Sequence, residues 1–361
     1  MASTPAPAAK PAHHNAFGFL RLVFASLVIV SHVPNLIDGN PWREPLYSLT
    51  RTMSLGSVAV NGFFLISGYL VVASFCKQPT VFAYLLRRVA RIVPGYLVAC
   101  LFCILIVAPL SGASWEAIAG SAKNLAVTTF KLEEPFVPGT FAGTHLPTLN
   151  GSMWTINFEF RAYLLVILLG LAGFFRWRQG VPLIVAGMWL GYEVTKGFVE
   201  APLLLSALSW LLPKEYLAIL FELTATFLVG STFYLYRDRI ALRPGLAIVA
   251  AVLLVPALFV PPLAVPAFAV LGGYIIFTLG FGVTRGPLAR INNANDISYG
   301  VYLYAWPVGK LLLWYWPAMP LLACIAANWL IACALGWVSW HVIEKPAMAL
   351  LTRKRAAAKP A

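Results

Sequence analysis

The sequence predicts an all-α protein, a polytopic integral membrane helix bundle with about ten transmembrane helices. Its 361 residues are 60% hydrophobic and only 11% charged, whereas a soluble globular chain carries about 45–50% apolar and about 25% charged residues. That gap excludes a soluble globular domain, and the composition equally excludes a disordered, collagen-like or disulfide-rich chain. At about 20 residues per span, the apolar runs suffice for about ten helices with short loops between them.

The apolar runs place the individual spans. The first run contains Arg21 and is not followed by a small-residue cleavage pattern, so we expect a retained span and not a signal peptide. Four prolines between positions 256 and 266 interrupt the seventh and eighth runs, which we predict as two helices joined by a tight turn. The run 203–212 is too short to span and is expected to be re-entrant or interfacial. The predicted spans are 17–37, 55–75, 92–112, 154–175, 181–198, 216–236, 243–261, 263–284, 297–316 and 319–342.

The basic residues are distributed unevenly between the two sides of the predicted bundle. A formal charge of +13 is also typical of nucleic-acid-binding proteins, but here the basic residues lie in short loops between apolar runs. Most of the 26 Lys and Arg fall in the terminal segments and the even-numbered loops, and such a side faces the cytoplasm. We therefore predict a multi-pass protein with both termini cytoplasmic, in contact with membrane lipids and with no nucleic-acid partner.

The chain divides into three predicted segments. Residues 1–15 form an Ala- and Pro-rich tail that is expected to be disordered, residues 16–346 form the membrane domain, and residues 347–361 form a basic cytoplasmic tail. The Cys100/Cys103 spacing resembles a metal or redox pair, but both lie in an apolar run with no further cysteine nearby. We interpret them as packing residues, and no metal site is predicted.

Ionisable side chains inside membrane spans are candidates for function, because each costs about 2.5–3.5 kcal/mol on insertion scales. In the predicted topology His32 and Glu159 fall in the outer halves of their helices, which places them level with each other. A histidine paired with a carboxylate is a common arrangement for a general base, although a lone histidine in a helix is often a structural hydrogen-bonding group. The full set is Arg21, His32, Glu159, Arg161, Glu222 and Lys310.

Arginines gather at the predicted cytoplasmic face. Arg21 lies there together with the basic start of the third helix, which contains Arg87, Arg88 and Arg91. Guanidinium groups bind phosphate bidentately, so this cluster suits a ligand with several phosphates. Membrane orientation alone also explains basic residues in a cytoplasmic loop, and the sequence leaves both interpretations open.

Several blocks of the chain resemble a known family when taken together. Arg21 is followed by ten residues and then His32, a spacing similar to the hallmark of the membrane acyltransferase-3 family of bacterial O-acyltransferases. The other blocks that resemble this family, in the same order, are Asn61–Leu70 (NGFFLISGYL), Arg87–Tyr96 (RRVARIVPGY), Ser152–Tyr163 (SMWTINFEFRAY), Ile297–Pro307 (ISYGVYLYAWP) and Ser339–Pro346 (SWHVIEKP). One position departs from the pattern, because many members carry histidine where this chain has Ala305. His32 is then the one histidine well inside a predicted span.

The resemblance implies an O-acyltransferase of the bacterial inner (plasma) membrane. It would transfer an acyl group, usually acetyl from acetyl-CoA, to a hydroxyl of a cell-envelope carbohydrate such as an exopolysaccharide or a lipid-linked oligosaccharide. Acetyl-CoA would be a co-substrate, with no permanently bound cofactor. His32 and Glu159 would be catalytic, and Arg21, Arg88 and Arg91 would hold the CoA phosphates. The channel or acceptor site would be formed by Asn61, Ser67, Trp154 and Tyr163.

Other features of the chain leave alternatives open. The outer segment 112–151 is expected to face the acceptor, with His145 as a possible contact, and His341 is expected to belong to the closing structural motif. A transporter or flippase for a lipid-linked sugar would also need polar residues in spans, but it would more naturally show inverted repeats. Succinyl could replace acetyl. The acceptor sugar, its hydroxyl, an acyl-histidine intermediate and the oligomeric state are not determined by the sequence.

Overall fold

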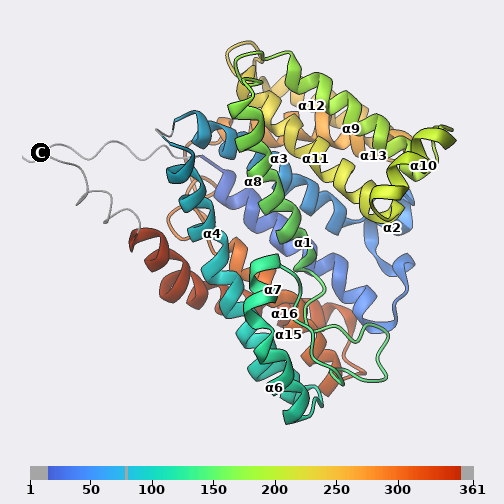
Figure 1. Cartoon of the computed structure of the whole chain (residues 1–361), viewed down its shortest axis with the longest axis vertical. Helices are drawn as coiled ribbons and strands as arrows, with labels where there is room; N and C mark the ends of the chain where they lie inside the picture. Colours follow the sequence, from blue (N-terminus) through green and yellow to red (C-terminus); the bar gives the residue numbers. More distant parts are fainter. Residues whose placement is uncertain (1–14, 78–79, 351–361) are drawn as a thin grey trace, which may run out of the picture.

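Helices form at all ten predicted ranges in the computed structural model, which describes residues 15–77 and 80–350 (Figure 1). Throughout those residues the regular structure is helical and no strand occurs, so the all-α bundle is confirmed. The long helices are α1 (Phe17–Asp38), α3 (Leu55–Cys76), α4 (Val81–Phe102), α8 (Trp154–Leu171), α9 (Gly180–Lys196), α11 (Lys214–Leu235), α12 (Pro244–Ala257), α13 (Pro261–Ala267) continuing into α14 (Gly273–Gly282), α15 (Ser298–Tyr315) and α16 (Leu321–Ser339).

Seven of these helices are long and apolar enough to cross a membrane, by length and composition, within the described part of the chain. The chain is therefore a multi-pass membrane protein, and the number of ten crossings stays a prediction. As expected, the proline-rich region forms two helices with a tight connection at residues 258–260. The short elements are η1 (Pro41–Arg43), α2 (Pro45–Thr50), η2 (Cys103–Val107), α5 (Ala108–Leu110), α6 (Trp115–Lys123), α7 (Leu125–Lys131), α10 (Pro202–Leu211), η3 (Phe268–Gly272) and η4 (Trp340–Glu344).

Two predicted boundaries are wrong. The third long helix begins at Val81 and not at residue 92, with the Thr80 hydroxyl accepting a hydrogen bond from Ala83 N as an N-cap. Its first turns contain the arginines, which are good helix formers although they lower the apolar signal. The last helix continues through η4 to Leu350, so the first residues of the predicted basic tail are helical; residues 1–14 and 351–361 lie outside the described residues.

The long helices alternate in direction and give the bundle two different ends. We call the end with the connections 172–179, 236–243 and 283–297 the basic end, because it carries most of the arginines. The opposite, loop end holds the connections 39–54, 112–153 and 316–320. In Figure 1 the last helical turns before Leu350, in dark red, lie on the left of the view, while α2 and α10 lie on the right.

Small residues bring α3 and α11 into direct backbone contact at the centre of the bundle. A Cβ atom on Gly68 would lie 1.9 Å from the carbonyl oxygen of Phe227, and one on Gly230 would lie 2.1 Å from that of Leu65. Membrane helices associate mainly through such close packing, because lipid supplies no hydrophobic driving force between them. Gly68 thus packs helices together, while its neighbour Ser67 is directed to the other side of α3.

One carboxylate joins three helices at the basic end. Asp296, in the loop before α15, accepts hydrogen bonds through Oδ2 from Arg21 of α1 at 2.8 Å and from Arg91 of α4 at 2.7 Å. Its Oδ1 accepts from Ser298 at 2.5 Å and from Asn292 at 3.0 Å. Burial would raise the pKa of the Asp296 carboxyl, but the two guanidiniums outweigh burial and hold this pKa at about 2. The charged form is therefore strongly favoured.

The end of the last helix, η4, joins the same network through Arg91. Glu344, which is 1% exposed, lies 3.5 Å from the Arg91 guanidinium and accepts a hydrogen bond from Ser339 at 3.0 Å. Gly18 completes the contact on the other side, because its carbonyl accepts from Asn292 and a Cβ there would lie 2.4 Å from the Asn292 carbonyl oxygen. The basic end is therefore one connected network of α1, α4, α15 and the end of α16.

A glycine substitution tests the central packing. We expect Gly230→Leu to lower the yield of folded protein and its thermal unfolding midpoint, since overpacking costs about 1–3 kcal/mol or more where the obstructing atom is backbone. Gly187→Leu on α9 is the matched control, because a Cβ there meets nothing within 4 Å. Size-exclusion profiles and thermal unfolding of both purified variants provide the measurement. Equal stability of the two variants would contradict the described α3–α11 contact.

The Asp296 network predicts a defined pH dependence. A pKa lowered from 3.8 to about 2 contributes about 2 kcal/mol of stability. That contribution is present above about pH 4 and is lost as the pH falls towards 2. We expect Asp296→Asn to be clearly less stable than wild type at pH 6 and the difference to shrink below pH 4. Asp238→Asn, at a side chain that is 63% exposed, should change little at any pH; an equal effect of the two substitutions would refute the interpretation.

Candidate active site

A cavity of about 130 Å³ lies between α1, α3, α4, α8 and α15. Six of the nine residues predicted for the site line it: Arg21, Ser67, Arg88, Arg91, Glu159 and Tyr163. The remainder of the lining combines apolar side chains with the hydroxyl-bearing residues Thr155, Ser298, Tyr299 and Tyr302. The cavity therefore brings a carboxylate, several hydroxyls and three guanidiniums into one partly apolar space.

Glu159 is fixed by hydroxyl groups and not by a histidine. Its Oε1 accepts a hydrogen bond from Tyr163 at 2.5 Å, one turn along α8, and another from Ser67 of α3 at 3.3 Å. Tyr163 is itself buried, and its carbonyl accepts from the Tyr84 hydroxyl at 3.1 Å. The carboxylate is thus held in a set orientation in the cavity wall.

The three predicted donor arginines differ in their partners. Arg21 and Arg91 both pair with Asp296, whereas Arg88 forms no ion pair with any described carboxylate. Its guanidinium carbon lies 5.9 Å from the Tyr84 ring and 5.6 Å from the Tyr163 ring, its Nη2 lies 3.5 Å from the Ser74 hydroxyl, and its buried Nε has no hydrogen-bond partner. Arg88 is consequently the one of these three arginines whose charge no described carboxylate neutralises.

A second, larger cavity adjoins the first on the side of the basic end. It has a volume of about 520 Å³ and shares Arg21, Leu70, Arg88 and Arg91 with the smaller one. Arg87, Asp296 and Trp340 also line it. The arginines therefore separate a larger vestibule at the basic end from the smaller cavity that contains Glu159.

His32 lies away from this cavity, and its predicted level placement with Glu159 is wrong. The histidine ring makes an edge contact with Trp306 at 5.0 Å between centroids. Its neighbour Ser31 lies beside Gly56, whereas Glu159 contacts Ser67; along α3 this separation corresponds to about 16 Å at 1.5 Å per residue. The prediction counted residues from the helix ends and assumed that all helices start and end at the same level of the bundle.

The helix ends differ in depth because the segment before α8 enters the bundle. Asn150 donates a hydrogen bond to the carbonyl of Leu303 at 2.7 Å, and the Tyr302 hydroxyl donates to the carbonyl of Ser152. A Cβ on Gly151 would lie 2.7 Å from the Trp306 ring. The α8 helix therefore starts inside the bundle, at a level nearer the basic end than the end of α1. As a result, Glu159 lies nearer the basic end than His32 does.

Two other predicted residues lie outside the cavity lining. Asn61 is 1% exposed, donates to Glu222 at 2.9 Å and accepts from Thr226 at 2.8 Å, so it joins α3 to α11. Trp154 is 39% exposed at the start of α8 and contacts Phe158 edge to face. The ionisable Glu222 of α11 thus has Asn61 of α3 as its partner. Neither Asn61 nor Trp154 lies with the other predicted site residues in the cavity lining.

Sequence reasoning missed Asp296, the residue that holds Arg21 and Arg91. A signal was present, because acidic residues are scarce among the loops of the basic end and Asp296 directly precedes a predicted span. Tyr299 was also missed; its ring lies 5.9 Å from the Arg91 guanidinium carbon and its hydroxyl donates to the Ile92 carbonyl at 3.1 Å. Aromatic residues are common in membrane helices, so no sequence pattern separates Tyr299 from packing residues.

Comparison with known proteins identifies the family. A family model described as an acyltransferase domain, of the acyltransferase-3 type, matches residues 14–343. Nodulation protein 10 of Rhizobium leguminosarum bv. viciae is 26% identical over 366 residues, which cover 94% of this chain and 95% of that protein. An O-acetyl transferase of Shigella phage Sf6 is 27% identical over 351 residues, covering 92% and 95% respectively.

A further relative matches only in part, and no solved structure matches significantly. Acyltransferase MdmB of Streptomyces mycarofaciens is 31% identical over 123 residues, which cover 32% of this chain and 29% of that protein. The family model, by contrast, extends over nearly the whole helical bundle. The chain therefore belongs to the membrane acyltransferase-3 family and is a multi-pass O-acyltransferase.

Proposed function

We propose that the protein transfers an acetyl group from acetyl-CoA to a hydroxyl of a cell-envelope carbohydrate, in the bacterial inner membrane with both termini cytoplasmic. The acceptor is an exopolysaccharide or a lipid-linked oligosaccharide. A phage relative described as an O-acetyl transferase supports the acyl group. Membership of the family favours transfer over the lipid-linked sugar transport that the sequence also allowed.

The observation that carries the proposal is that Arg21, Arg88 and Arg91 line both of the adjoining cavities. CoA phosphates in the larger vestibule would meet the un-neutralised charge of Arg88, because charge-assisted bidentate contacts are the strongest that a phosphate makes. Arg21 and Arg91 line the same space but are already held by Asp296. In this proposal they shape the donor site and Arg88 supplies its principal phosphate contact.

The donor's acyl arm extends from the vestibule through the Glu159 cavity towards the loop end. This arm would be positioned by Ser67, Tyr163 and Glu159, since these residues line the smaller cavity together with the arginines. At the loop end His32 takes the proton of the acceptor hydroxyl, whose oxygen attacks the thioester carbonyl. The carbon–sulfur bond breaks, and the departing CoA thiolate receives the proton from the imidazolium.

The overall reaction can be tested in cells. Polysaccharide from cells that express the wild-type chain should carry the mass of one acetyl group per modified unit, and cells without the chain should lack it. His32→Ala should not restore the substituent, because loss of a general base lowers the rate by roughly 10²–10⁴-fold. Mass spectrometry normalised to membrane protein level gives the measurement.

The same experiment contains its controls. Glu159→Gln should retain more transfer than His32→Ala, because an amide still hydrogen-bonds to Tyr163 and Ser67. His341→Ala should behave as wild type, since His341 contacts only its own helix at Trp337 among the described hydrogen bonds. Wild-type transfer by His32→Ala would remove the base assignment, and unmodified polysaccharide in both strains would remove the proposed reaction.

The donor site predicts different outcomes for two neighbouring arginines. Arg88→Gln should weaken acetyl-CoA binding by about tenfold or more with little loss of stability, since one charged hydrogen-bond donor is removed. Arg91→Gln should destabilise the protein by about 3–5 kcal/mol, because Asp296 and Glu344 lose their shared partner. Calorimetric titration and thermal unfolding of purified protein separate these effects. Arg178→Gln is the control, and unchanged affinity in Arg88→Gln would assign that residue to membrane orientation.

A further inference from the structure

A buried lysine lies at the loop end without a carboxylate partner in the described chain. Lys310 of α15 is 3% exposed. Its ammonium donates to the Thr144 hydroxyl at 2.9 Å and lies 4.8 Å from the centroid of the Phe141 ring. A buried charge is costly unless another charge and hydrogen bonds compensate it. A hydroxyl and an aromatic face hold the ammonium but leave its charge un-neutralised.

A second unsatisfied donor lies one helical turn away. Trp306 and Lys310 are four residues apart on α15 and share one face of that helix. Trp306 is 6% exposed, and its buried indole Nε1 has no hydrogen-bond partner in the described structure. The same indole contacts the ring of His32. Both groups can only donate hydrogen bonds, so a ligand that satisfies them must accept.

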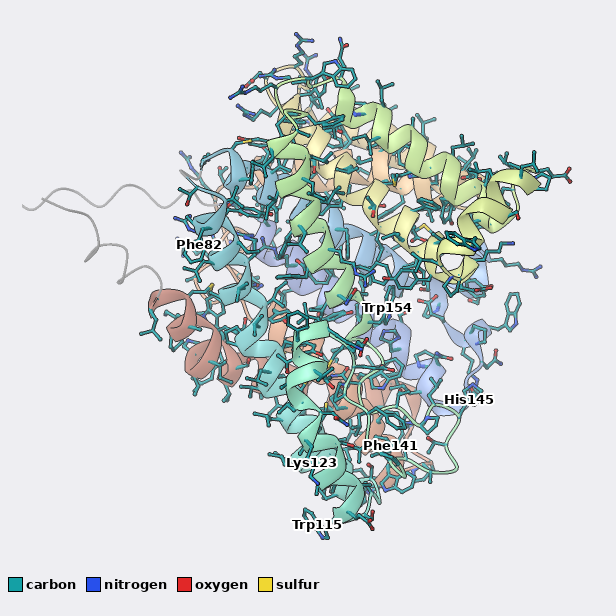
Figure 2. The ribbon with its side chains drawn as sticks, viewed as in Figure 1. Phe82, Trp115, Lys123, Phe141, His145 and Trp154 are labelled. Atoms are coloured by element: carbon teal, nitrogen blue, oxygen red, sulfur yellow. The ribbon has the colours of Figure 1, made fainter. Side chains whose placement is uncertain are left out.

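The surrounding loop has the character of a binding segment. Residues 132–153 connect α7 to α8 without any helix, and connections of this length in a compact domain are usually functional. Figure 2 shows Phe141 and His145 of this loop on the lower right of the view, Trp154 at the start of α8 nearer the centre, and Phe82 at the start of α4 on the left. The His145 ring packs on Gly39 at the end of α1. The loop therefore meets α1 and α15 beside His32.

One more polar group in this loop lacks a partner. The Thr148 hydroxyl is buried without a hydrogen bond, between Thr144, which contacts Lys310, and Gly151, which contacts Trp306. We call Lys310, Trp306, Thr144 and Thr148 the Lys310 cluster. It combines one cation, one indole N–H and two hydroxyls on α15 and on the loop that packs against α15.

We propose that the Lys310 cluster binds an oxyanion, a carboxylate or phosphate, and that the enzyme thereby selects an anionic acceptor. This inference rests on the proposed function only in placing the acceptor hydroxyl at the neighbouring His32. A neutral sugar would satisfy the donors but not the charge, whereas a carboxylate or phosphate satisfies both. The oxyanion belongs to an acidic sugar, a sugar phosphate or a lipid head group, which share this chemistry.

Ligand-induced thermal shifts test the inference without requiring acyl transfer. The protein is placed in phosphatidylcholine nanodiscs with excess CoA, so that the donor arginines are occupied. Glucuronate or glucose 1-phosphate should raise the unfolding temperature, and methyl glucoside at the same concentration should raise it much less. In phosphatidylglycerol nanodiscs, a lipid-derived anion would instead stabilise the protein before any sugar is added.

Variants assign the effect to the cluster. Lys310→Met, which removes the charge at similar length, should weaken binding of the anion by at least about tenfold, and Lys310→Arg should retain the preference. Lys214→Met, at an exposed lysine of the loop end, should respond as wild type. Equal shifts by the charged and neutral sugars in wild type, without a response to phosphatidylglycerol, would overturn the proposal. An undiminished response in Lys310→Met would do the same.

Discussion

The basic end of the bundle depends on two ion pairs that share one carboxylate oxygen. Asp296 holds Arg21 of α1 and Arg91 of α4, so helices that are distant in the chain are joined through the loop before α15. Without this carboxylate, two partly buried guanidiniums would lie side by side and repel each other. The same contacts leave Arg88, among the three donor candidates, with aromatic neighbours and an uncompensated charge. In the proposed donor site, structural and binding roles are thus divided among similar side chains.

The helices were predictable because a long apolar run is a strong and local signal. All ten predicted ranges contain a helix. The start at Val81 was not predictable from apolar windows, since a helix that leaves the apolar region keeps its backbone hydrogen bonds while its arginines lower the apolar signal. Direct backbone contact at Gly68 and Gly230 is likewise invisible in one sequence, because it depends on which helix lies opposite.

The candidate site was predictable in composition but not in geometry. Ionisable residues in apolar runs identified Arg21 and Glu159, and both line the cavity. Their partners come from distant segments, such as Asp296 and Ser67, and spacing along the chain carries no information about them. The offset between His32 and Glu159 depends on how deeply the segment before Trp154 enters the bundle. That depth is a tertiary property, fixed by contacts such as the one from Asn150 to Leu303.

The way in which this segment is attached has an evolutionary consequence. It is anchored near its two ends: Phe141 N donates to the Ser111 carbonyl, the Asn150 side chain donates to the Leu303 carbonyl, and the Ser152 carbonyl accepts from the Tyr302 hydroxyl. The anchoring atoms belong to Phe141, Asn150 and Ser152, so the exposed residues between Phe141 and Asn150 can be exchanged while these anchors persist. The acyl-transfer chemistry and the choice of acceptor can therefore diversify separately. In such an architecture the reaction centre within the bundle stays constant, while the sequence of the loop beside it can vary.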